Sequence, residues 1–212
     1  MKRSFMIAIV LLVTMGAGAQ TIKEVYVGYS LVMEHYKFSS SSYTESGTDK
    51  GSGVEVGFNF IRPISKPFAV TYGIQALYGW DDGINQRLDA GQKDRFIKCL
   101  VPVSLLCEFR PSNKNFAIEP FVGINGSFYM YGKSKLNGTT YDWFDSNYSL
   151  NVNRMQIGWH VGVNFVFGRY VATVNYQQDF TNVHSEVVNY MGVGHYDYNH
   201  WANMEIRLGY RF

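Results

Sequence analysis

The chain has 212 residues, of which 46% are hydrophobic, 17% aromatic and 17% charged, and it contains two cysteines. This length fits one domain, the apolar content excludes a disordered or collagen-like chain, and two cysteines exclude a disulfide framework. Nineteen basic residues against 17 acidic ones give no basis for nucleic-acid binding.

Residues 1–19 have the pattern of a secretory signal peptide. Lys2 and Arg3 precede an apolar run at 5–15, and Ala17-Gly18-Ala19 precedes Gln20. A charged start, a short apolar core and an Ala-x-Ala end predict cleavage after Ala19, which leaves residues 20–212 as an exported domain. The alternative is an uncleaved anchor, but the run is shorter than the ~20 apolar residues of a spanning helix.

Eight later segments alternate apolar and polar residues with a period of two. In the first, Val25 and Val27 alternate with Glu24 and Gly28. This period predicts β-strands with one apolar face each. The predicted strands span 24–36, 51–61, 68–80, 95–109, 116–131, 154–167, 170–180 and 201–212.

The connections between these strands alternate in length. Those after the even-numbered strands are brief and basic: 62–67, 110–115 and 168–169. Those after the odd-numbered strands are long and polar, and all but 81–94 contain tyrosine: 37–50, 81–94, 132–153 and 181–199. Such alternation is typical of outer-membrane barrels. We therefore predict an all-β fold, an eight-stranded antiparallel up-and-down transmembrane β-barrel with both ends on the periplasmic side.

The composition of the two strand faces predicts which one turns inward. The apolar face carries one glycine, Gly126, and no charge in any strand body. A lysine or arginine facing lipid at the midplane costs ~2–4 kcal/mol, so an apolar exterior is expected. A soluble lipocalin-type barrel with its apolar side around a ligand is the alternative. The polar face carries nine glycines: Gly28, Gly53, Gly57, Gly73, Gly79, Gly123, Gly158, Gly162 and Gly209.

Aromatic residues on the apolar face cluster near the two strand ends, which predicts two girdles at the membrane interfaces. Near the short turns are Phe58, Phe60, Phe68, Phe109, Phe116, Phe165, Phe167, Tyr170, Tyr210 and Phe212. Near the long loops are Tyr78, Trp80, Phe96 and Phe128.

The segment Leu100-Val101-Pro102-Val103-Ser104-Leu105 and the ending Arg207-Leu208-Gly209-Tyr210-Arg211-Phe212 resemble the small outer-membrane β-barrel proteins common in Bacteroidetes, within the OmpA-like and OmpX-like superfamily. The terminal phenylalanine resembles the signal read by the barrel-assembly machinery, although Arg207 stands where that signal has a glycine. The resemblance implies an outer-membrane location in a Gram-negative cell, with outer-membrane lipid and the assembly machinery as partners.

Ionisable residues share the polar face. Because eight strands leave a lumen barely wide enough for side chains, we expect them to pair in a plugged interior, the alternative being a proton or ion path. The acids are Glu24, Glu34, Glu55, Glu108, Glu119, Asp179 and Glu205, the bases are Lys98, Arg110, Arg154, Arg207 and Arg211, and the amides are Gln75, Asn125, Gln156, Asn164 and Gln177.

Few residues suggest chemistry. His195, Asp197 and His200 offer imidazole and carboxylate groups for Zn²⁺ or Cu²⁺, but their spacing matches no strong metal signature. His184-Ser185-Glu186 contains the residue types of a hydrolase, yet consecutive residues rarely converge. We therefore predict no catalytic, cofactor or metal residues, and we expect His160 to be a hydrogen-bonded lumen residue.

Cys99 and Cys107 lie on one face of one predicted strand. Eight residues at ~3.3 Å each separate them by ~26 Å, whereas a disulfide needs Cα atoms within ~7 Å. We predict two unbridged, outward-facing cysteines.

Aromatic residues in the long loops occur among Ser, Gly, Asn and Asp, a composition typical of adaptable recognition surfaces, unless these are simply solvated loops. We predict a monomeric barrel with an envelope-structural or adhesion-like role toward host or cell-surface ligands. The alternatives are a lipid A deacylase- or acyltransferase-like enzyme and a soluble ligand-binding barrel. The loop aromatics are Tyr43, Tyr141, Trp143, Phe144, Tyr148, Tyr190, Tyr196 and Tyr198.

Overall fold

The computed structural model describes residues 21–39, 44–81, 93–111, 115–136, 138–145, 152–183, 187–189 and 192–212. The predicted signal peptide and its cleavage site lie outside these ranges. No helix in the described part of the chain is long and apolar enough to cross a membrane.

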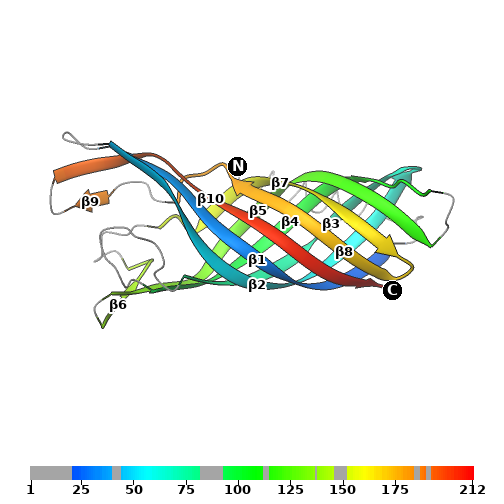
Figure 1. Ribbon diagram of the computed structural model, residues 1–212, viewed down its shortest axis with the longest axis horizontal. Coiled ribbons are helices and arrows are strands. Elements are labelled where there is room, and N and C mark those ends of the chain that lie inside the picture. Colours follow the sequence, from blue (N-terminus) through cyan, green and yellow to red (C-terminus); the bar gives the residue numbers. More distant parts are fainter. Residues whose placement is uncertain are drawn as a thin grey trace, which may run out of the picture.

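Eight long strands form a closed antiparallel barrel (Figure 1). Each pairs with the next along the chain, and β1 pairs with β10 to close the sheet. The eight predicted strands are therefore confirmed. They are β1 (Ile22–Ser39), β2 (Thr44–Ser65), β3 (Phe68–Asp81), β4 (Lys93–Cys107), β5 (Phe116–Leu136), β7 (Met155–Phe167), β8 (Tyr170–Asp179) and β10 (Gly192–Arg211).

Two short strands add to the barrel at one end. β6 (Thr139–Asp142) pairs with β5, and β9 (Val187–Asn189) pairs with β10. We call this the loop end; it lies on the left of Figure 1. The opposite, turn end has the short connections between β2 and β3, β4 and β5, and β7 and β8, and the C-terminus lies there.

The strands run further toward the loop end than the sequence predicted. Residues 37–50 were expected to be a loop, but β1 and β2 stay paired as far as Ser39 and Thr44. Likewise, β5 continues to Leu136 and β10 begins at Gly192. Beyond the zone of outward apolar side chains, both faces of a strand are polar. The backbone hydrogen bonds between the strands continue there, although the alternation that predicts a strand has ended.

The apolar side chains face outward and the ionisable ones inward. Val101, Ile157 and Leu208 are 50%, 58% and 65% exposed, whereas Glu55 and Arg207 are 1% and 9% exposed. This confirms the predicted orientation of the two faces and contradicts the alternative in which the apolar side of the strands surrounds the lumen.

The glycines of the polar face make room for bulky lumen side chains. A Cβ on Gly57 would lie 2.1 Å from the Tyr26 ring, and one on Gly79 would lie 2.1 Å from the Phe96 ring. By contrast, a Cβ on the outward Gly126 would meet nothing within 4 Å. Crowding inside the barrel therefore requires glycine on the inner face.

Aromatic pairs in tilted and edge-to-face contact mark the exterior near the turn end, as predicted. Ring centroids are 5.0 Å apart in Phe116–Phe167 and 5.6 Å apart in Tyr170–Tyr210. Phe96 corrects the predicted girdle at the other end, because it alternates with the outward Ile97 and is buried inside the barrel. Cys99 and Cys107 are both free and partly exposed, as expected.

Candidate functional site

Ion pairs bind the strands together across the lumen at the turn end. Arg211, near the end of β10, donates from Nε to Glu24 on β1 at 2.8 Å. Its two terminal nitrogens donate to the carboxylate of Glu119 on β5 at 2.8 and 2.7 Å. One guanidinium thus joins the two chain-terminal strands to the far wall of the barrel.

A second guanidinium, that of Arg207, lies farther from the turn end, between two carboxylates. Arg207 donates from Nε to Glu55 on β2 at 2.6 Å and from Nη2 to Glu205 on its own strand. Nη2 also donates to Gln75 on β3 at 2.9 Å, and the guanidinium carbon lies 4.8 Å from the centre of the Tyr26 ring. Two nitrogens and one face of the Arg207 guanidinium therefore have protein partners.

Toward the loop end, Lys98 on β4 pairs with Asp179 on β8 at 2.6 Å, both side chains being almost fully buried. The Lys98 ammonium also lies 5.2 Å from the centre of the Tyr129 ring. The predicted pairing of lumen charges is confirmed for these residues.

Three residues predicted to be in the lumen, Glu108, Arg110 and Arg154, lie elsewhere. Glu108 and Arg110 form an exposed pair at the turn end, with Nε to Oε1 at 2.6 Å. The hydrogen bond from Arg110 holds the pKa of Glu108 below its usual value. Arg154 is exposed near the loop end, where its guanidinium carbon lies 3.9 Å from the centre of the Phe144 ring. Both bases follow or precede a strand, where the alternation no longer assigns a face.

A small polar cavity of about 40 Å³ lies inside the barrel. His160, a predicted lumen residue, is buried there and its Nε2 lies 2.7 Å from Ser104 Oγ. His160 Nδ1 has no hydrogen-bond partner among the described residues, and neither has the nearby Gln177 Nε2. A polar cavity of this size holds a few water molecules. The Ser–His pair lacks a carboxylate on Nδ1 and space for an acyl or glycan substrate, so this geometry does not form a hydrolase centre.

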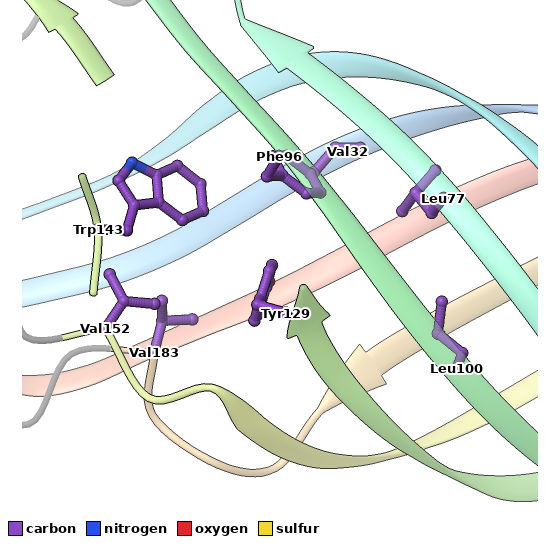
Figure 2. Close-up of a cluster of buried hydrophobic side chains, with 8 residues drawn as sticks. All are labelled: Val32, Leu77, Phe96, Leu100, Tyr129, Trp143, Val152 and Val183. Carbon is purple, nitrogen blue, oxygen red and sulfur yellow. The ribbon is translucent and has the colours of Figure 1, made fainter. Parts of the chain in front are cut away.

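An apolar cluster fills the lumen at the loop end (Figure 2). Strand residues in it, such as Val32 and Leu77, occupy inward positions on the polar face. They are joined by side chains from the connections: Trp143, which follows β6, and Val152 and Val183. The cluster comprises Val32, Leu77, Phe96, Leu100, Tyr129, Trp143, Val152 and Val183.

Trp143 corrects the prediction of a recognition surface formed by loop aromatics. It is buried, packs against Phe96 with ring centroids 5.6 Å apart, and donates from Nε1 to Ser134 Oγ at 2.7 Å. A Cβ on Gly132 would lie 2.4 Å from the indole, so that glycine provides its space. Sequence reasoning missed this cluster, although bulky apolar residues on the polar face, such as Leu77 and Leu100, were a signal for it.

The residues considered for a metal site and for a hydrolase are only partly described. His184, Ser185 and Glu186 lie outside the described residues, as do the side chains of His195 and Asp197. His200 is half-buried and stacks on Tyr198, with ring centroids 6.0 Å apart and an angle of 3°. Among the described side chains, no three His, Cys, Asp or Glu residues are close enough to hold a metal ion.

The loop aromatics have different environments. Tyr198 is exposed, Phe144 packs against the apolar cluster, and Tyr141 is partly exposed. Of the predicted recognition surface, only Tyr141 and Tyr198 remain at least partly exposed among the described side chains. The remaining members, whose side chains lie outside the description, are Tyr43, Tyr148, Tyr190 and Tyr196.

No protein-family model matches the sequence, and no curated protein does. Among solved structures, the attachment invasion locus protein Ail of Yersinia pestis has a TM-score of 0.47 and 12% identity, covering 91% of this chain and 99% of Ail. Neisserial surface protein A gives 0.46 and 12%, covering 92% and 100%. OprG, an outer-membrane protein from Pseudomonas aeruginosa, gives 0.45 and 12%, covering 92% and 97%. These three structural neighbours are small outer-membrane β-barrels.

Proposed function

We propose that the protein is an integral outer-membrane barrel that conducts no ions and acts in envelope structure or surface interaction through its loop end. The observation that carries the proposal is the distribution of polar and apolar side chains, which is the reverse of that in a water-soluble protein. Large apolar side chains surround the outside, whereas eight charged side chains are buried inside: Glu24, Glu55, Lys98, Glu119, Asp179, Glu205, Arg207 and Arg211. A lipid environment stabilises such an exterior, and in water it would be a large aggregation-prone surface.

The signal-peptide pattern of residues 1–19 supports the same placement, because it predicts export. Closure of the sheet by β1 and β10 is also needed in a bilayer, because it leaves no unpaired strand edge in the barrel wall. The turn end then faces the periplasm and the loop end faces the outside.

Two features support a closed lumen. The ion pairs cross the lumen from β10 to β5 and from β10 to β2, and the apolar cluster around Trp143 fills the loop end above them. A hydrated ion would have to break a buried ion pair and displace packed aromatic rings to pass. The loop end is consequently the part of the molecule available for contact with other surfaces.

We expect the folded protein to migrate faster than its boiled form in detergent gels, and to give no sustained current in planar bilayers. We expect the closed barrel to resist unfolding by detergent, and the ion pairs and the apolar cluster of the described residues to block a continuous water path. A large porin and protein-free bilayers provide the positive and negative controls for the current. Steady channel openings would contradict the closed lumen, and failure to partition into lipid would contradict the membrane placement.

For surface interaction, we expect cells that express the protein to attach to matrix-coated surfaces several-fold more than cells without it. Replacing residues 38–45 with a two-residue turn should remove the increase if this part of the loop end makes the contact. Lys37 and Ser46 are paired, so a short turn can connect them without disturbing the barrel. Heat-modifiable migration of the shortened protein confirms its folding. Equal attachment with and without the protein would contradict the surface interaction, and only the role in envelope structure would remain.

A further inference from the structure

Four cations lie together on the outer face of the barrel near the loop end. Lys93 and Arg95 on β4 are directly opposite Lys135 and Lys133 on β5. Phe96, which follows Arg95, and Ser134, between Lys133 and Lys135, are buried on the inner face, so these four positions are on the outer one. We call Lys93, Arg95, Lys133 and Lys135 the β4–β5 cation patch.

The pairing within this patch is unfavourable by itself. Directly opposed residues have Cβ atoms ~4.5–5.5 Å apart, and like charges at this distance destabilise a sheet. One described acid, Asp142 on β6, lies opposite Lys133 on its other side. Asp94 lies between Lys93 and Arg95 in β4, so its side chain is on the inner face. Four cations against one acid give these two rows of the described outer surface a net charge of +3, which an anionic ligand would offset.

The patch lies directly above the outward aromatic residues. Arg95 is paired with Trp80, and the next outward row toward the turn end contains Tyr78, Ile97 and Tyr131. The Tyr78 and Trp80 rings are 5.8 Å apart, and the Lys133 ammonium lies 5.4 Å from the centre of the Tyr131 ring. Aromatic girdles lie at the level of the lipid headgroups, so the cations are at the depth of lipid phosphates.

We propose that the β4–β5 cation patch binds the phosphate groups of an anionic, phosphorylated lipid of the outer leaflet, of the lipid A type. The proposal rests on the membrane placement given above and adds a ligand class and its site. Lysine ammonium groups act as point charges toward phosphate, and Arg95 adds a planar donor group. The bound lipid removes the repulsion between the paired cations and fixes a lipid against β4 and β5.

The test is a titration of the folded full-length barrel, in neutral detergent, with fluorescent bisphosphorylated lipid A. Each cation near a charged surface contributes about a five-fold change in affinity, so K93Q/K133Q/K135Q should weaken binding on the order of 100-fold. The variant K23Q/K66Q/R169Q removes three exposed cations at the turn end and should bind as the unaltered protein does. Lipid A without phosphates should bind the unaltered protein and K93Q/K133Q/K135Q equally.

Equal lipid A affinity of the unaltered protein and K93Q/K133Q/K135Q overturns the proposal. So does a result in which this variant loses binding of a soluble sulfated polysaccharide but keeps that of lipid A, because the patch would then be a site for soluble polyanions. Heat-modifiable migration is measured on every variant first. A barrel that fails to fold in detergent or to enter lipid contradicts the proposed function, whereas a folded, inserted barrel without phosphate preference contradicts only this inference.

Discussion

Replacing Arg207 with methionine should destabilise the folded barrel by about 3–5 kcal/mol, because Glu55 and Glu205 would remain buried without their counter-ion. The change also removes the hydrogen bond to Gln75 and the contact with the Tyr26 ring. The measurement is the urea midpoint of unfolding in detergent micelles or lipid vesicles, followed by the gel shift between folded and unfolded forms.

Two further variants separate loss of the charge from loss of packing. Adding E55Q and E205Q to R207M should recover part of the lost stability, since neutral amides no longer need a cation. Arg110 provides the exposed control: its ion pair with Glu108 is at the surface, so R110M should change the free energy of unfolding by at most ~1 kcal/mol. If R207M and R110M have equal effects, the lumen network does not stabilise the barrel.

Replacing Gly57 with leucine should prevent the barrel from closing, or destabilise it by more than ~3 kcal/mol. A Cβ alone would lie 2.1 Å from the Tyr26 ring, and leucine adds three more carbons. Tyr26 cannot move aside, since Arg207 packs on its ring and its hydroxyl donates to Gln75 at 3.2 Å. Overpacking usually costs ~1–3 kcal/mol, and a rigid neighbour raises this cost.

Gly126 is the matched control for this substitution, because it is also a strand glycine but faces outward. A Cβ there would meet nothing within 4 Å, so G126L should fold with nearly unchanged stability. The yield of heat-modifiable protein measures both variants. Comparable yields for G57L and G126L would show that the inner face is not crowded.

The alternation of apolar and polar residues in the sequence was sufficient to predict the strands of the barrel wall. Alternation in segments such as 24–36 and 201–212 predicted eight strands and the outward position of Val101, Ile157 and Leu208, because one side of each strand had to be apolar. The same parity placed Glu55 and Arg207 inside. It did not predict the continuation of β1, β2 and β10 toward the loop end, where neither face is apolar.

The sequence by itself therefore determined the number of strands, the direction of each face and the need for glycine inside, since these follow from a period of two and from the cost of exposing charge to an apolar surface. Only the tertiary structure decided which lumen charges pair and that Trp143 fills the loop end rather than displaying its ring to solvent. Cross-lumen partners such as Arg211 and Glu119 lie far apart in the chain, and only the stagger of a closed sheet sets which of them face each other.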